Sequence, residues 1–209
     1  EEMKWFAQNG FAVLAPDLLG TGETFPADYH GDAYMEGISM NIWYTAVLVN
    51  KSIAGIRAGD VSRLVGLAKK RFTLKGVYAL AKGEMSPVLL HAAVFNPSIQ
   101  NIALVDPLSS YISVSMCQFY KVRYIYNVVP GAIQHYDLPD LGACIAPRSL
   151  LMVNITDGAG EMLDHIELQN EVSVIRKAYK MENAENGLDI RQGISGREIR
   201  DAYLKWMIK

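Results

Sequence analysis

The sequence alternates short, continuous apolar runs with longer amphipathic segments, and this alternation limits the possible folds more than any other feature. The segments between the runs carry apolar residues at helical spacing, as 52–72 does. Parallel strands joined by helices form sheets that are covered on both faces. The sequence therefore predicts an α/β fold with a doubly wound, mainly parallel sheet. The predicted strands lie near residues 11–16, 73–80, 101–106, 149–155 and 187–191.

Helices are expected on either side of these strands, and one long stretch is expected to be irregular. Gly10 is placed to end the first helix, because glycine favours the left-handed conformation that follows many helix C-termini. The irregular stretch is 108–137, which is rich in tyrosine and valine. The predicted helices cover residues 2–8, 52–72, 84–95, 139–145, 160–181 and 196–208.

Composition narrows the function classes. A chain of 209 residues suits one domain, here taken as 1–209. The net charge of −2 and pI of about 6.1 give no basic footprint for nucleic acid or for an anionic membrane. No apolar run reaches the length of a membrane span. No H-x-x-x-H motif or cysteine pair indicates a metal, so we expect no cofactor.

Two features leave alternatives open. Cys117 and Cys144 lie far apart in the sequence, so they are either two free thiols, which are commonly buried, or the two halves of a disulfide. The chain begins without an initiator methionine, at Glu1, inside a predicted helix. We therefore expect it to be the C-terminal part of a longer protein.

In open parallel sheets, binding sites lie beyond the carboxyl ends of the strands. That rule selects residues 17–24, 81–86, 106–110, 154–161 and 192–196. The first stretch contains Gly20-x-Gly22 but lacks the third glycine and the helix of a dinucleotide fingerprint, so it predicts a loop in which Asp17 caps backbone amides.

The stretch "VYALAKGEMSPVLLHAA" (77–93) predicts a strand, a tight corner and a helix. A hydrolase carries G-x-S-x-G at such a corner, with the nucleophilic serine on a strained turn. Here the corner reads Ala81-Lys82-Gly83-Glu84-Met85, so glycine stands where the serine would be. Glycine tolerates a positive φ, so the turn is expected to persist without a side chain that could attack a substrate.

Four stretches occur in the order seen in α/β-hydrolases: "NGFAVLAPDLLGTGET", the corner at 81–85, "DLPDLGACIAPRSLLMVNITD" and the closing "YLKWM". The chain resembles the acetyl xylan esterase-like branch of that superfamily over nearly its whole length. The resemblance begins at the helix before the family's fourth strand, so it implies that the first three strands are missing. It also implies an ester substrate such as an acetylated polysaccharide, and a periplasmic or extracellular location.

The resemblance assigns positions to the catalytic parts of an esterase. Gly83 occupies the nucleophile position, and the backbone N–H of Glu84 would be one oxyanion donor. Asp157 matches the family's acid, although it could equally cap a helix that begins near Gly160. The catalytic histidine would lie in the loop 191–198, "RQGISGRE", which contains no histidine. Arg148 matches a structural anchor at the start of a strand.

The chemistry could instead have moved to other residues. Ser86 lies one helical turn beyond Gly83, where we expect its hydroxyl to bond a backbone carbonyl or to cap the helix. His165 is the one histidine near an expected site, one or two turns into the helix after Asp157. His91 is expected to be packed on its helix. His30 and His135 are expected in surface loops.

Two functions remain open. The chain is either a catalytically silent esterase-like domain associated with carbohydrate-degrading proteins, or an active carbohydrate esterase with atypical or relocated residues. The loss of serine and histidine together favours the silent domain, because acyl transfer needs an activated nucleophile. Because the first strands are missing, we also expect an exposed sheet edge that another domain or chain covers.

Overall fold

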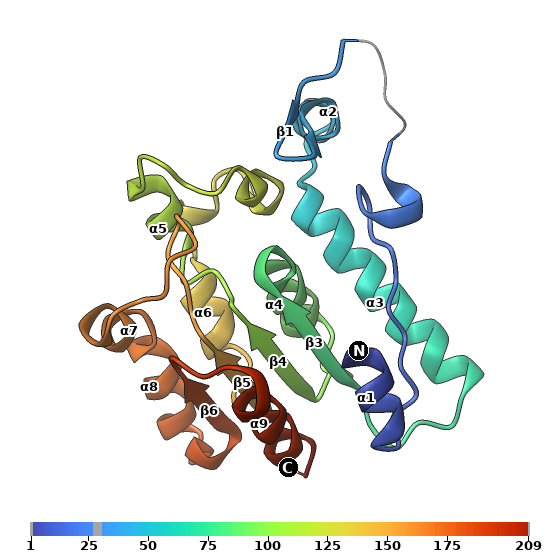
Figure 1. Ribbon diagram of the computed structural model, residues 1–209, viewed down its shortest axis with the longest axis vertical. Coiled ribbons are helices and arrows are strands. Elements are labelled where there is room, and N and C mark those ends of the chain that lie inside the picture. The colour runs from blue at the N-terminus through green and yellow to red at the C-terminus, as the bar shows by residue number, and fades with distance from the viewer. Residues whose placement is uncertain (1, 27–30, 209) are drawn as a thin grey trace.

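The computed structural model describes residues 2–26 and 31–208, and its centre is a four-stranded parallel sheet (Figure 1). The strand order is β3–β4–β5–β6, so consecutive strands are neighbours throughout. Residue pairs such as Ala79–Ile102 and Ile102–Leu150 fix the register between neighbours. The bounds are β3 (Tyr78–Lys82), β4 (Asn101–Val105), β5 (Ser149–Val153) and β6 (Leu188–Arg191). The predicted α/β class and parallel sheet are confirmed.

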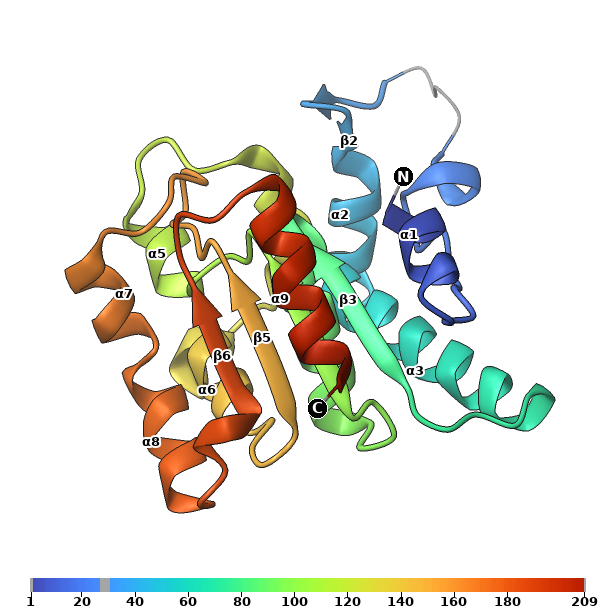
Figure 2. The same cartoon turned by 60° about the horizontal axis from the view of Figure 1, so that its bottom comes forward.

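Helices cover both faces of the sheet, but unequally. The larger core lies against α3 (Ile53–Arg71), α4 (Ser86–Phe95), α6 (Leu138–Ala143) and α8 (Ser173–Met181). The smaller core lies on the other face, where α9 (Gly196–Ile208) crosses β4 and β5 (Figure 2). The N-terminal helix α1 (Glu2–Gln8) joins this smaller core through Trp5 and Phe6.

The remaining elements stand above the carboxyl ends of the strands or connect the layers. They include a small hairpin and a short helix that no sequence prediction covered, β1 (Tyr34–Met35), β2 (Ile38–Ser39) and α2 (Met40–Leu48). Two more helices are α5 (Tyr111–Met116) and α7 (His165–Glu171). The 3-10 turns are η1 (Gly22–Thr24), η2 (Gly83–Met85), η3 (Val122–Asn127), η4 (Ala132–Gln134) and η5 (Glu185–Gly187).

Four sequence predictions about elements were wrong in whole or in part. The strand predicted over 73–80 begins only at Tyr78, and the stretch 108–137, predicted to be irregular, contains α5. Residues 11–16 form no strand, because β3 pairs only with β4 within the described residues and no strand lies beside this segment. The predicted helix 160–181 begins five residues later, at His165, where the Asp164 carboxylate accepts from the backbone N–H groups of Ile166 and Glu167. That helix is also divided at Val172 into α7 and α8.

Other predictions at single positions are confirmed. Gly10 has a φ of +89° two residues beyond the last residue of α1, Gln8. The Arg148 guanidinium Nη1 donates to the carbonyl oxygens of Ala93, at 2.7 Å, and Ile99, at 2.9 Å, and so anchors the start of β5 to α4 and β4. Cys117 and Cys144 are free thiols, with Cys144 exposed rather than buried. None of the helices in the described ranges is long and apolar enough to cross a bilayer.

Candidate functional site

Three adjacent strands are each followed directly by a residue with left-handed backbone, and these three residues line one pocket. Gly83 follows β3 with a φ of +49°, Asp106 follows β4 with +49°, and Asn154 follows β5 one residue beyond Val153 with +55°. The pocket has a volume of about 690 Å³ and also takes in side chains from the 121–124 and 156–162 segments. Its place is the one that open parallel sheets use for ligands.

The corner at Gly83 keeps the strained turn that the sequence predicted. β3 ends at Lys82, η2 makes the turn, and α4 begins at Ser86. A methyl group built on Gly83 would meet no atom within 4 Å, so the position faces open space. Lys82, just before the turn, forms an ion pair with Glu2 of α1, with 2.8 Å between Nζ and Oε2. The turn therefore presents a side-chain position to the pocket but carries no nucleophile.

Ser86, the residue to which the chemistry could have moved, lies behind the corner and does not line the pocket. Its side chain is fully buried, and its hydroxyl has no hydrogen-bond partner among the described residues. The expectation that it bonds a backbone carbonyl or caps α4 is therefore wrong, since the capping position is Met85 and provides no side-chain bond.

Charged side chains of both signs line the pocket. Glu84, directly after Gly83, pairs with Arg123 from η3 at 3.4 Å. The carboxylates of Asp106 and Glu161 form no ion pair within the described ranges. The Lys121 side chain packs closely over Gly160, where an added Cβ would collide with it. The lining can therefore accept hydrogen bonds from hydroxyl groups and donate them to oxygen atoms of a ligand.

A buried pair of hydroxyls forms the wall of the pocket. The hydroxyl of Tyr124 and Oγ1 of Thr156 are 3.4 Å apart, and Thr156 Oγ1 also donates to the Pro107 carbonyl at 3.3 Å. Burial raises the pKa of Tyr124, and the carboxylates of Asp157, Glu84 and Asp106 raise it further, outweighing the opposing effect of the Thr156 bond. The Tyr124 hydroxyl therefore keeps its proton and can donate a hydrogen bond.

The loop 191–198 is the place where the family's catalytic histidine would lie, and in this chain two amide side chains hold it in position. Asn154 Nδ2 donates to the Ile194 carbonyl at 2.8 Å, and its Oδ1 accepts from the Ile194 N–H at 3.1 Å. Gln192 forms a matching pair of bonds with the backbone of Ile155, both at 2.9 Å. These four bonds order the 192–194 loop beside the pocket without supplying a base.

Asp157 has a local structural role. Its carboxylate accepts from the N–H of Glu161 at 2.8 Å, and the two residues are also joined through their backbones. This closes a turn, so the expectation that Asp157 caps a helix beginning at Gly160 is wrong in its detail. Asp157 does not belong to the pocket lining, although its charge reaches Tyr124.

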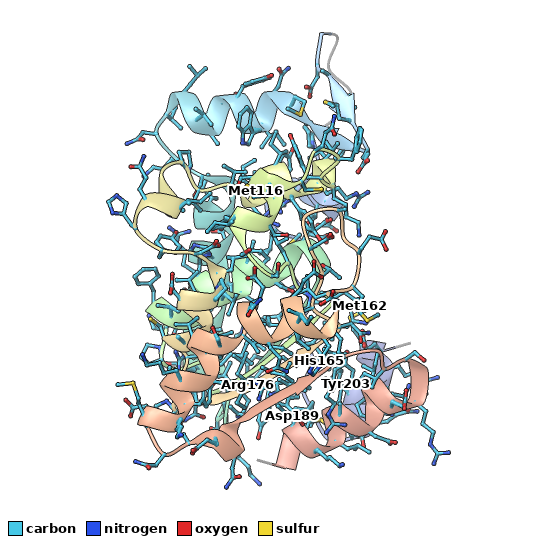
Figure 3. The ribbon with its side chains drawn as sticks, turned by 90° about the vertical axis from the view of Figure 1, so that its left-hand side faces the viewer. Met116, Met162, His165, Arg176, Asp189 and Tyr203 are labelled. Carbon is cyan, nitrogen blue, oxygen red and sulfur yellow. The ribbon has the colours of Figure 1, made fainter. Side chains whose placement is uncertain are left out.

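No histidine of the described residues lines the pocket. His165 is the first residue of α7, not one or two turns into it, and its side chain is exposed (Figure 3). His91 is buried, with its ring nitrogens 2.7 Å from the Pro87 carbonyl and 2.9 Å from the Tyr136 hydroxyl, as a packed histidine would be. His135 is exposed, and His30 lies outside the described residues.

Sequence reasoning located this site but missed some of its residues. The stretches 81–86, 106–110 and 154–161 all reach the pocket, as the rule about strand ends predicted. Asp106, Asn154 and Thr156 lie in two of those stretches, and each follows an apolar strand directly or within three residues. Tyr124 had no such signal, because it belongs to the stretch that was predicted to be irregular.

Comparisons with known proteins agree with the fold. No family model and no curated protein matches the chain. A crystal structure from Bacteroides fragilis, described as that of a "putative acetyl xylan esterase", matches with a TM-score of 0.59 and 16% sequence identity. The match covers 90% of this chain and 48% of that chain, so this chain spans about half the length of that protein. The chain has an esterase-like α/β fold.

Proposed function

We propose that this chain is a catalytically silent esterase-like domain whose pocket binds a polar ligand without hydrolysing it. The observation that carries this proposal is the corner at Gly83, which keeps the geometry of a nucleophile turn and faces open space with no side chain. Acyl transfer needs an activated nucleophile and a base within hydrogen-bond reach. Among the residues that the structure describes, the pocket lining includes neither a serine nor a histidine.

The ligand class follows from the lining and from the structural match. Carboxylates, an amide, hydroxyls and two cations surround the pocket, which suits a ligand rich in hydroxyl and carbonyl groups. The matching crystal structure is named for an esterase of acetylated xylan, so an acetylated oligosaccharide is the ligand to test first. Such a ligand would place this domain among carbohydrate-degrading proteins.

The hydrolysis test uses p-nitrophenyl acetate and acetylated xylan, with the folded state verified by circular dichroism. We expect no turnover above the buffer rate for the unchanged chain or for Ser86→Ala. Turnover that Ser86→Ala abolishes would contradict the proposal and would identify a relocated nucleophile. Turnover that survives this change but falls in His165→Ala would indicate a water-based mechanism through His165.

The binding test uses calorimetry with acetylated xylo-oligosaccharides and their deacetylated forms. We expect binding that weakens about tenfold in both Asp106→Asn and Thr156→Val. The first change replaces a charged acceptor by a neutral amide, and the second removes a hydroxyl group from the pocket. Glu182→Gln is the control, since Glu182 is exposed at the end of α8 and away from the pocket. Equal affinity for all variants would place the ligand elsewhere, and no binding would exclude this ligand class.

A further inference from the structure

The connection between β4 and α6 is a surface segment with very few charges. Among the Asp, Glu, Lys and Arg residues of the chain, residues 108–136 contain only Lys121 and Arg123, whereas a fifth of the whole chain is charged. Surfaces that are poor in charge and rich in aromatic residues and methionine are typical of binding surfaces. The large apolar and aromatic side chains that the segment exposes are Ile112, Met116, Phe119, Tyr120, Val128 and Ile133.

The same segment forms one wall of the pocket at the strand ends. Lys121, Arg123 and Tyr124 line that pocket. The loop after β5 holds the segment in place, because the Gly158 N–H donates to Ser113 Oγ at 2.7 Å and the Gly158 carbonyl accepts from the Lys121 N–H at 2.9 Å. Figure 1 shows this loop beside α5, above the sheet. A ligand that extends out of the pocket past Lys121 therefore continues onto this segment.

Two aromatic side chains lie directly at this exit. Phe119 is 82% exposed and Tyr120 is 41% exposed, and both immediately precede Lys121. The Cα atoms of Phe119 and Lys121 are at most about 7 Å apart, because only two residues separate them. Among the described segments that line the pocket, 121–124 is the one that exposed aromatic residues continue. We call Phe119 and Tyr120 the aromatic platform.

The size of the pocket limits how much of a ligand it can enclose. Its volume of about 690 Å³ suits a ligand of about one or two sugar rings. A sugar ring has a face of C–H groups and an edge of hydroxyl groups. The C–H face packs well on an aromatic ring, whose π-face is negative, while the hydroxyl groups stay in water. A neutral sugar polymer therefore suits a surface with few charges.

We infer that the aromatic platform is a second subsite, on which the rings of a sugar polymer stack where the polymer leaves the pocket past Lys121. This inference rests on the proposed function for the class of ligand. It adds that the ligand is a polymer and that Phe119 determines the preference for long over short ligands. A protein partner fits less well, because the platform continues directly into a pocket lined by hydrogen-bonding groups.

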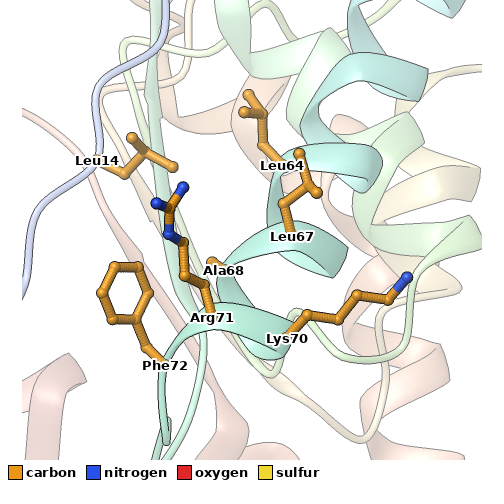
Figure 4. Close-up of a pocket in the computed structure, with 7 residues that line it drawn as sticks. All are labelled: Leu14, Leu64, Leu67, Ala68, Lys70, Arg71 and Phe72. Carbon is orange, nitrogen blue, oxygen red and sulfur yellow. The ribbon is translucent and has the colours of Figure 1, made fainter.

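Apolar side chains also gather around a second hollow, which provides a comparison surface. This hollow of about 430 Å³ lies between Leu14 and the C-terminal part of α3 (Figure 4), and it shares no residue with the first pocket. Phe72 lines it and is 62% exposed. Unspecific adhesion of sugars to apolar surface would therefore involve Phe72 as well as Phe119.

The test measures affinity against ligand length by calorimetry with acetylated xylobiose, xylotetraose and xylohexaose. We expect affinity to rise with length in the unchanged chain. Phe119→Ala should weaken binding of the hexaose about three- to tenfold and leave binding of the biose unchanged. Phe119→Trp should keep the dependence on length, because tryptophan also offers an aromatic face. Asp106→Asn, in the pocket, should weaken binding of every length alike.

Two control variants remove a phenylalanine elsewhere. Phe95→Ala is the matched control, because Phe95 is also 82% exposed but lies at the end of α4 and does not line the pocket. Phe72→Ala tests adhesion to the second hollow. Both should bind all three ligands as the unchanged chain does. A loss of hexaose binding in either control that equals the loss in Phe119→Ala would overturn the platform.

The outcomes separate the platform from the proposed function. Affinity that is equal for all lengths and unchanged in Phe119→Ala would overturn the platform while the pocket still binds its ligand. Binding of the hexaose alone, weakened by Phe119→Ala but not by Asp106→Asn, would support the platform and contradict ligand binding in the pocket. An absence of binding at every length would overturn both. Self-association that rises with protein concentration and disappears in Phe119→Ala would overturn the platform in favour of a protein interface.

Discussion

At the scale of single residues, the left-handed backbone at Gly83 makes a measurable prediction. Any residue with a Cβ is strained there by about 1 kcal/mol, although the added atom meets nothing within 4 Å. Gly83→Ala should therefore lower the free energy of unfolding by about 1 kcal/mol in urea denaturation. Gly83→Ser should have the same cost and should produce no esterase turnover, because none of the described residues that line the pocket is a histidine.

Gly66 gives the matched control for this prediction. It lies inside α3 with open space around a built Cβ and without a positive φ. Gly66→Ala should raise the free energy of unfolding by about 0.5–1 kcal/mol, through helix propensity and a smaller unfolded ensemble. If both alanine variants changed stability in the same direction, the strained turn at Gly83 would be disproved.

His91 predicts how stability depends on pH. Burial lowers the pKa of this histidine, although its bond with the Pro87 carbonyl opposes the shift, so the folded state keeps the ring neutral where the unfolded chain takes up a proton. The contribution of the neutral His91 ring to the free energy of unfolding is complete above about pH 6.5, the usual histidine pKa. It is lost as the pH falls below that value, because the unfolded chain then binds the proton more readily. His91→Gln should therefore lose less stability between pH 7.5 and 5.5 than the unchanged chain, measured by urea midpoints. An equal loss in both proteins would contradict the assignment.

Some residues of the pocket could be predicted from the sequence, and others could not. A glycine in the position of a nucleophile and the rule about strand ends were enough to place Gly83, Asp106 and Asn154 near one another. The burial of Ser86 could not be read from its neighbours, because it depends on how α4 packs behind the corner. The role of Tyr124 depends on η3 folding back over the strand ends, which no local pattern encodes.

At the scale of elements, the predictions succeeded where local and tertiary preferences agree. β4 and β5 are apolar runs with a strand on each side, and both were found within two residues at each end. Residues 11–16 have the same composition but no partner, and a strand requires its ladder. The helix predicted to begin at 160 was delayed to His165, because the turn closed by Asp157 and the cap by Asp164 take the intervening backbone groups.

Arg148 joins three elements, and its removal should be costly. Its donors satisfy two carbonyl groups at the end of α4 and before β4. Arg148→Met keeps the apolar stem but leaves these carbonyls without their charged donor, so the free energy of unfolding should fall by about 2–3 kcal/mol. Arg63→Met is the comparison, because its ion pair with Asp60 is exposed and should contribute less than about 0.5 kcal/mol. Similar losses in both variants would exclude the anchoring role.

At the scale of the whole molecule, the two faces of the sheet are covered to different depths. One face carries α3, α4, α6 and α8, whereas the other carries α9 with α1 beside it. On the face with fewer helices, Tyr203 of α9 connects α9 to α1. Its hydroxyl donates to the Glu2 carboxylate at 2.9 Å, and its ring contacts Trp5 and Phe6. The chain ends therefore meet on the thinner face.

This asymmetry predicts that α1 and α9 open together at a lower free energy than the sheet. Segments with fewer buried contacts exchange their amides through partial openings, whereas core strands require global unfolding. Native-state hydrogen exchange in low urea should give α1 and α9 one shared free energy of opening, and this value should be lower than the free energy of opening of β4 and β5. Trp206→Ala, at a 3% exposed position, should lower this free energy of opening by about 3 kcal/mol or more. Leu204→Ala, at a 38% exposed position on the same helix, should change it by less than about 1 kcal/mol. If α1 kept its protection while α9 lost its own, the two helices would not form one cooperative unit, and Tyr203 would not join the two ends of the chain.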